Sequence, residues 1–268
     1  MDDGSGQATN SNNQTTGASA AGFNFNRRST LALAGTGWGE VRLGRDLVPQ
    51  YSNHASGDPF GNVGVGSAIN FTGNISGVTA VRASNMISYF TPGGLGGFGM
   101  QLSHYRGENA SGVANPDDGN GSGVRGTYTN GPLSLGLGLG KTEYLAGDAT
   151  KRNVYAAYDF GTARLMGMYN SDKTGSLSAR GFMIGTTVPV GAGEIKAAFS
   201  SNQTDAAGDP KSKKIAFGYV HNLSKRTAVY GTYARVSNSG GAASSLNGAV
   251  TAPNASSSGF DFGLRHSF

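Results

Sequence analysis

The side chains most often used for catalysis and metal binding are few in this chain of 268 residues, which has four histidines and no cysteine. The histidines lack the i, i+4 spacing of a helical metal site, which favours surface or rim positions over ligand roles. We therefore predict no catalytic site, no metal site and no cofactor. The four are expected in a loop, at a strand end, in a turn and at the C-terminus: His54, His104, His221 and His266.

Paired carboxylates and glycine-rich segments also lack the context that catalysis or phosphate binding needs. Asp2-Asp3 and Asp117-Asp118 fall in predicted loops, where solvent exposure or cation binding at a rim explains them better than acid/base catalysis. The glycine-rich segments 35–39 and 61–66 have neither a following lysine nor the strand-to-helix setting of a phosphate-binding loop. We interpret the first as a turn and the second as a bend within a longer loop.

Composition narrows the class of protein further. Glycine accounts for 45 residues and charged residues for only 14%, yet hydrophobic residues reach 37%, which is too apolar for simple disorder. The glycines keep no three-residue period, which excludes collagen, and no run of about 18 apolar residues predicts a transmembrane helix. The net charge of +5 arises from 21 basic residues without a dense patch, so we predict no nucleic-acid partner.

Hydrophobic side chains alternate with small or polar ones along much of the chain. Between positions 133 and 140, leucines occupy the odd positions, and a serine and glycines occupy the even ones. A period of two is typical of a β-strand with one apolar face. Similar segments recur to the C-terminus, and those near 164–169 and 227–236 have mixed parity. Together they predict about thirteen strands of roughly 8 to 11 residues, the length of a tilted strand that crosses a bilayer.

Long and short connections are expected to alternate between these strands. This alternation predicts an all-β, transmembrane, antiparallel up-and-down β-barrel with elaborate loops at one end and tight hairpins at the other. A soluble sandwich with Greek-key crossings would not produce it. The expected long connections are 46–81, 107–121, 142–150, 171–178, 205–211 and 238–258.

Strand parity predicts which side chains face the lumen. Glycines at 136, 138 and 140 are expected to leave the lumen open. Charged side chains are expected inward as well, because an ionised group facing lipid at mid-depth costs about 2 to 4 kcal/mol. Arg27 and Arg45 have the opposite parity and are expected near a membrane interface or beyond a bulge. The predicted lumen-facing basic residues are Arg28, Arg42, Arg82, Arg125, Lys196 and Arg265.

An ordered set of motifs resembles the Gram-negative trimeric porins of beta-proteobacterial type. The chain reads FNRRST at 25–30, followed by an apolar strand and then by GWGEVRLGRD at 37–46, before Pro49. The resemblance covers 23–268. The motifs in this order are specific to the family, although each motif alone is weak evidence. Further matching segments lie at 58–61, 82–85, 223–227 and 263–268.

The resemblance implies a sixteen-stranded barrel, a homotrimer in the lipid of the bacterial outer membrane, and passive diffusion of ions and small hydrophilic solutes. It implies that the loop of about 46–81, with Asp46, Asp58 and Phe60, folds into the pore as a constriction. It also gives Arg45 a role in the pore. The terminal Phe268 resembles the C-terminal signal that the barrel assembly machinery reads, and its ring suits an interfacial aromatic girdle.

The N-terminal part of the chain departs from the family pattern. The start lacks the features of a signal peptide, and three further strands would be needed to make sixteen. We therefore interpret Met1 as an internal start and expect that thirteen strands alone, with two unpaired edges, form no stable pore. Residues 1–22 are expected to be a polar extracellular loop that latches onto a neighbouring subunit or is simply mobile.

Charge selectivity follows from the predicted lumen-facing residues. Rings of basic side chains favour anions, and acids across from them create a field that sorts solutes by charge. The facing acids are Glu40 on the wall and Asp46 and Asp58 in the loop, so we expect weak to moderate anion preference. Alternatively, Arg42 only pins the loop to the wall. Other classes also stay open: an outer-membrane adhesin or binding protein acting through its long loops, a soluble β-rich lectin, and an outer-membrane enzyme.

Overall fold

The computed structural model describes residues 7–8, 20–21, 27–68, 80–107, 109, 111–246 and 249–268. Thirteen antiparallel strands form one sheet in which every strand pairs with its neighbours in sequence, in the order β15 to β3. This confirms the predicted up-and-down meander and its strand number. The strands are β3 (Ser29–Gly35), β4 (Gly39–Leu47), β5 (Arg82–Phe90), β6 (Phe98–Tyr105), β7 (Gly121–Asn130), β8 (Leu133–Thr142), β9 (Ala149–Asp159), β10 (Arg164–Thr174), β11 (Leu177–Val190), β12 (Gly193–Thr204), β13 (Lys211–Asn222), β14 (Thr227–Ser239) and β15 (Ser257–His266).

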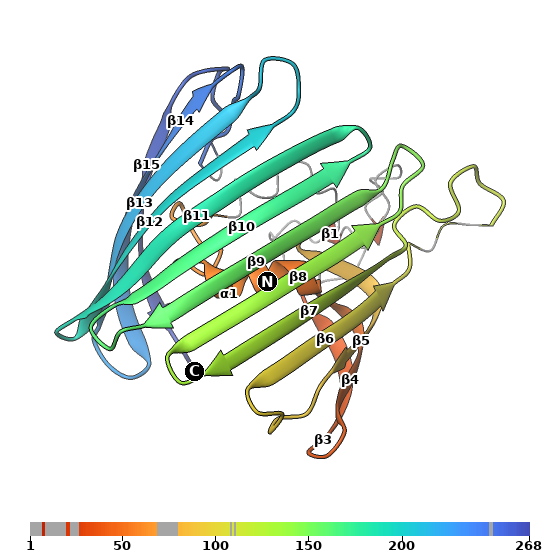
Figure 1. Ribbon diagram of the computed structural model, residues 1–268, viewed down its shortest axis with the longest axis horizontal. Coiled ribbons are helices and arrows are strands. Elements are labelled where there is room, and N and C mark those ends of the chain that lie inside the picture. Colours follow the sequence, from red (N-terminus) through yellow and green to blue (C-terminus); the bar gives the residue numbers. More distant parts are fainter. Residues whose placement is uncertain are drawn as a thin grey trace.

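The sheet curves into a trough, with β3 and β15 at its two ends (Figure 1). Each of these two strands has one hydrogen-bonded neighbour among the described strands. Most of the N-terminal segment lies outside the described residues. Its described part is a short antiparallel pair, β1 (Gln7–Ala8) with β2 (Ala20–Ala21), so the prediction of loop alone was wrong for these four residues.

The two faces of the sheet differ as the alternation predicts. On β8, Leu135 and Leu137 are exposed on the convex face, whereas Gly136 and Gly138 are buried on the concave face. Leu31 on the convex face is 72% exposed. The structure also assigns the faces of the two strands with mixed parity. β10 turns its methionines inward and its leucine and tyrosine outward, and β14 buries Ala228 and Ala234.

The connections alternate in length less strictly than predicted. The β4–β5, β6–β7 and β14–β15 connections are long, and the hairpins at the opposite end are short. The expected loop at 171–178 was wrong, because β10 and β11 pair up to Thr174 and Leu177 and leave only a tight turn with Gly175 at positive φ. The turn at 36–38 and the bend at 61–66 are confirmed.

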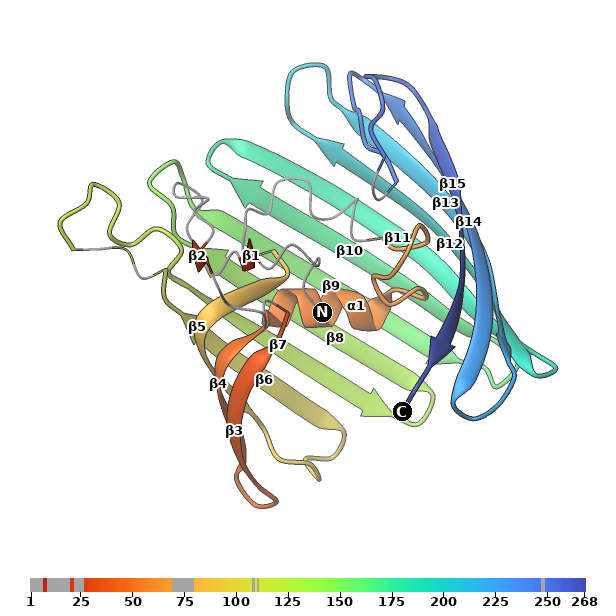
Figure 2. The ribbon, with the colours of Figure 1, turned by 180° about the vertical axis from the view of Figure 1, so that it is seen from behind.

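The described part of the β4–β5 connection lies on the concave face (Figure 2). It begins with α1 (Pro49–Gly57), which has proline in its first turn, where the missing N–H costs nothing. The sequence has no apolar stripe that would predict this helix, because most of its buried side chains are polar. Among the described residues, no helix is long and apolar enough to cross a membrane.

Small residues on the concave face make room for α1. A Cβ atom built on Gly138 would lie 2.8 Å from the Cβ atom of Asn53 and 3.0 Å from the Cα atom of Gln50. Gly123 and Gly140 approach the first turn of the helix in the same way. The prediction that the glycines of β8 leave the lumen open was therefore wrong, because the helix fills the space that they provide.

Candidate functional site

Five arginines gather at the loop end of β3, β4 and β5. Arg27 and Arg28 precede β3, Arg42 and Arg45 lie on β4, and Arg82 begins β5. The pairing of these strands brings the segments together, since Asp46 is in register with Ala83 and Leu47 with Arg82. Among the described residues, two carboxylates, Glu40 and Asp46, share this part of the wall, so positive charge exceeds negative charge there by three. We call these seven residues the arginine cluster.

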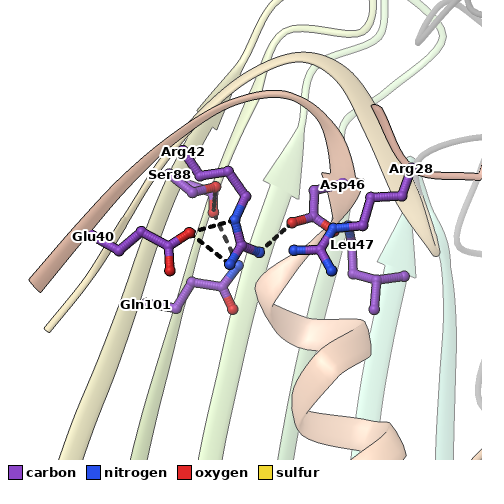
Figure 3. A network of polar contacts seen from close by, with 8 residues as sticks. Arg28, Glu40, Arg42, Asp46, Leu47, Ser88 and Gln101 are labelled. Carbon is purple, nitrogen blue, oxygen red and sulfur yellow. Dashed lines mark hydrogen bonds and ion pairs between the residues drawn. The ribbon is translucent and has the colours of Figure 1, made fainter. Parts of the chain in front are cut away.

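Ion pairs connect four members of the arginine cluster (Figure 3). Arg42 donates from Nη1 to Asp46 at 2.5 Å and from Nε to Glu40 at 2.7 Å. Its guanidinium also lies 4.4 Å from the centroid of the Phe90 ring. Arg28 reaches the other oxygen of Asp46 at 3.3 Å and keeps a side chain that is 56% exposed. Arg42 is thus fixed on the wall, whereas Arg28 offers an accessible positive charge.

The structure corrects the predicted position of Asp46. This residue lies in β4, is buried, and accepts bonds from arginines of its own wall, so it does not face them from a loop. Asp46 is also held by the backbone, because Oδ1, the oxygen that meets Arg28, accepts the N–H of Leu47 at 2.8 Å. Asp46 therefore does not create a transverse field between opposite walls. It neutralises part of the positive charge of the arginine cluster.

A bulge explains the parity of Arg45. The register between β4 and β5 shifts between Gly44 and Asp46, which turns Arg45 towards Ser84, whose hydroxyl accepts a bond from Nη1 at 2.8 Å. The expected bulge is confirmed. Arg82 lies within electrostatic range of Arg45 and Arg27, so positive charge is concentrated at this part of the cluster.

The other predicted basic residues lie apart from the arginine cluster. Arg125 on β7 donates to the Ser56 hydroxyl of α1 at 2.7 Å, and Lys196 on β12 donates to the Pro59 carbonyl at 2.9 Å. Both connect the wall to the β4–β5 connection. Arg265 is exposed near the end of β15.

Asp58 shapes the connection and does not face the pore. It is buried, and its carboxylate accepts the backbone N–H groups of Phe60, Asn62 and Ala68. Burial raises the pKa of Asp58, while these hydrogen bonds and Lys214 act in the opposite direction. The expectation of Asp58 as a lumen-facing charge was therefore wrong.

Phe60 packs against the wall. It joins an apolar cluster that includes Val65, Ala216 and Val236, and its ring lies close to Gly218 of β13. Three polar contacts hold the same stretch of the connection to distant strands. Lys214 of β13 donates to the Ser67 carbonyl, Asp261 of β15 accepts the N–H of Val65, and Lys196 contacts Pro59 as described above.

A buried polar contact between α1 and β9 was missed from the sequence. Asn53 donates to the side chain of Asn153 at 2.7 Å, and Asn153 donates to the Gln50 carbonyl at 2.9 Å. His54, expected at the surface or rim, is fully buried and bonded through Nδ1 to Asn62 at 2.8 Å. Burial lowers the pKa of His54 to about 3, and the nearby Lys151 ammonium acts in the same direction. His54 is therefore neutral near pH 7.

Two features of the sequence point to this contact in retrospect. Proline at position 49 is typical of a helix start, and the glycines of β8 leave space on the inner face that a packed element must fill. The terminal Phe268 lies beyond β15 and is fully exposed, with its ring 5.1 Å from that of His266.

The arrangement can attract and guide anions, because accessible guanidinium groups lie beside a connection that crosses the concave face. Its described residues include no paired nucleophile and base. A family model described as Gram-negative porin matches residues 2–241. Outer membrane porin protein 32 of Delftia acidovorans is 38% identical over 269 residues, which cover 93% of this chain and 76% of that protein. An outer membrane porin protein of Bordetella pertussis is 29% identical over 79% of this chain and 67% of that one.

Solved structures show the same fold. The outer membrane protein OmpT of Vibrio cholerae, in its trimer form, superposes with a TM-score of 0.67 at 13% identity and covers 90% of this chain and 80% of that chain. OmpF of Salmonella typhi, in a complex with daunomycin, gives a TM-score of 0.61 at 18% identity over 78% of this chain and 70% of that chain. At such identities the likeness concerns the fold alone.

Proposed function

This chain belongs to the Gram-negative porin family, and from that premise we propose that it conducts ions and small hydrophilic solutes by passive diffusion, with a weak to moderate preference for anions. As an outer-membrane porin it needs a water-filled path on the concave face. No catalytic role is proposed. The observation that carries the anion preference is the arginine cluster, whose five guanidinium groups outnumber its two carboxylates on one wall.

The β4–β5 connection is proposed to be the constriction of the pore. Its described part begins at Val48, after the end of β4, and so starts two residues later than the sequence suggested. Support comes from its contacts, which run from Asn153 on β9 through Lys196 on β12 to Asp261 on β15. A segment held on so many strands narrows the concave side at a fixed position.

A homotrimer embedded in outer-membrane lipid is proposed as the working assembly, with insertion by the barrel assembly machinery. Family membership and the fold shared with a trimeric outer membrane protein support the trimer. The edges of β3 and β15 must also be paired in the conducting form, because unpaired backbone groups are costly in lipid. The latch proposed for 1–22 lies mostly outside the described residues.

The binding alternatives have less support. Exposed apolar side chains follow the outward positions of nearly every strand, which suits lipid and argues against a soluble lectin. An adhesin that acts through its loops remains a formal alternative, but no described loop offers a built site.

Planar-bilayer recordings and liposome swelling test this proposal together. For the form in which the edges of β3 and β15 are paired, we expect stepwise conductance increments, and swelling rates that fall as the size of an added sugar rises. A protein that inserts but neither conducts nor admits small sugars would contradict the channel. Partitioning into the aqueous phase without detergent would favour the lectin.

A further inference from the structure

A cavity lies on the concave face of β5, β6 and β7, outside the arginine cluster. Its volume is about 210 Å³, which is room for about seven water molecules. We call it the β5–β7 cavity. Six of the residues that line it are Phe90, Thr91, Gly99, Gln101, Arg125 and Thr127.

Strand register places three of these side chains in one row on the concave face. Phe90 is the direct partner of Gln101, and Gln101 is the direct partner of Arg125, so all three point to the same side of the sheet. Gln101 is only 5% exposed. Arg125 donates to Ser56 in the last turn of α1, so the row lies beside the β4–β5 connection.

Gly99 leaves space at the hairpin side of this row. It is the direct partner of Thr127, and a Cβ atom built on Gly99 would lie 2.9 Å from the Oγ1 atom of Thr127. Glycine inside a strand often marks a place where another group approaches the backbone closely. A side chain at position 99 would therefore occupy part of the β5–β7 cavity.

The polar groups of the cavity include both donors and acceptors. Among the described residues, Arg125 bonds only to the Ser56 hydroxyl, at 2.7 Å, which leaves most of its five N–H donors for a ligand. Gln101 donates one long hydrogen bond from Nε2 to Ser103, at 3.4 Å, and no described group donates to its Oε1. The Thr127 hydroxyl donates to a backbone carbonyl at 3.3 Å, and its oxygen can still accept.

Phe90 gives the cavity a flat apolar wall. The Arg42 guanidinium lies over its ring, 4.4 Å from the centroid, and this contact helps to fix the ring. The C–H groups on one face of a sugar ring carry partial positive charge and can pack on an aromatic ring. An aromatic wall beside convergent donors and acceptors therefore suits a small cyclic polyol.

The balance of donors and acceptors favours a neutral ligand over an anion. A hydroxyl group both donates and accepts, whereas a carboxylate only accepts and would leave Gln101 Oε1 and the Thr127 oxygen without donors. Glu40, the direct partner of Phe90 on β4, adds a negative charge on that side of the row. Attraction of an anion by Arg125 is therefore partly opposed.

We propose that the β5–β7 cavity binds one ring of a neutral monosaccharide. Sugar hydroxyls bond to Arg125, Gln101 and Thr127, and a C–H face of the ring packs on Phe90. This inference rests on the proposed function, because diffusion through the channel brings hydrophilic solutes to this wall. It names a solute class that is held at one place in the lumen, beyond the general passage of small solutes.

Sugar binding by the protein in the form in which the edges of β3 and β15 are paired tests the inference. The probe is glucose, with sorbitol and glucuronate as comparisons, and dissociation constants are measured by ligand-observed saturation-transfer NMR in a detergent without a sugar headgroup. We expect saturable binding of glucose and weaker binding of sorbitol, which has no ring. Glucuronate should bind no more tightly than glucose.

Three variants remove different features of the cavity. Arg125→Gln should weaken glucose binding about tenfold and Gln101→Leu about fivefold, the effects of losing hydrogen bonds from a charged and from a neutral group. Gly99→Ala should also weaken binding, because it takes up space without removing a polar group. Ser56→Ala is the matched control: it breaks the bond between Arg125 and α1 but keeps the guanidinium, so glucose affinity should stay unchanged.

Unchanged glucose affinity in both Arg125→Gln and Gly99→Ala would overturn the inference. So would tighter binding of glucuronate than of glucose, which would make the cavity an anion site, or equal binding of sorbitol and glucose. Because binding is measured without conduction, the two proposals can fail separately. A protein that conducts but binds no glucose would refute the sugar site and leave the channel proposal standing.

Discussion

At the scale of single residues, Asp46 sets how much of the arginine cluster remains available to anions. It is buried and pairs with both Arg28 and Arg42. The sequence predicted most of these residues to face the pore but could not show that acid and arginines share one wall. That pairing depends on the β4–β5 register and its bulge, which are tertiary features.

Asp46→Asn should increase the preference for anions. The amide oxygen still accepts the Leu47 N–H, while one negative charge disappears from the cluster. A unit charge about 10 Å from an ion in water contributes about 0.4 kcal/mol, with opposite signs for chloride and potassium, so the chloride-to-potassium permeability ratio should rise by up to about fourfold. The reversal potential in a salt gradient measures this ratio. Asp209→Asn, in an exposed loop, is the control, and an equal shift in both variants would show that position in the cluster is irrelevant.

His54 should make the packing of α1 sensitive to acid. Its folded pKa of about 3 lies below its ordinary value of 6.5, because burial disfavours the charged ring. The unfolded chain therefore binds the proton first. The stability that the neutral ring contributes is complete above about pH 6.5 and is lost as the pH falls towards 3, by on the order of a few kcal/mol.

The pH dependence of the thermal midpoint tests this account of His54. In the wild type the midpoint should fall between pH 6.5 and 3, and His54→Gln should flatten that part of the curve. His221→Gln, in a half-buried position at the end of β13, should leave it unchanged. Identical acid sensitivity in the wild type and His54→Gln would refute a role for this ring.

At the scale of elements, the strands were predictable and the helix was not. A period of two predicted the strands and the faces of β8, because an apolar surface towards lipid imposes a regular pattern on each strand. α1 escaped prediction because its buried side chains, among them Gln50, Asn53 and His54, are polar. Their burial is compensated by partners about a hundred residues away, such as Asn153, which no local pattern reveals.

Gly138→Ala should displace α1 from the wall. The added methyl group would meet the Asn53 Cβ atom at 2.8 Å and backbone of Gln50 at 3.0 Å, so overpacking of about 1 to 3 kcal/mol is expected. The measurement is the thermal midpoint together with the open-channel noise, which should increase. Gly126→Ala on the outward face of β7 is the matched control, since nothing lies within 4 Å of its added atom. Equal thermal midpoints and equal channel noise in the two variants would mean that the small residues of β8 are not needed for the packing of α1.

At the scale of the whole molecule, the sheet combines an apolar convex face, suited to lipid, with a concave face on which the described part of the β4–β5 connection lies. The sequence could predict the sheet order because each strand pairs with its neighbours along the chain. It could not predict which strands the connection touches, because the contacts of Ser67 and Val65 reach β13 and β15 far away in sequence.

Deleting Phe268 should reduce assembly more than conductance. The residue is fully exposed beyond β15 and contacts no part of the concave face, so channels that do form should conduct normally. The amount of folded protein in isolated outer membranes, compared with the conductance of purified channels, separates the two effects. Normal yield after the deletion would remove Phe268 from the assembly signal.

The reversal potential of the wild-type protein in a potassium chloride gradient tests the proposed anion preference of the channel. We expect the sign that indicates chloride preference, and a smaller preference when Arg28 and Arg82, two cluster arginines that carboxylates hold less tightly than Arg42, are replaced together with Gln. A potassium-selective wild type, or a double variant with unchanged selectivity, would contradict it.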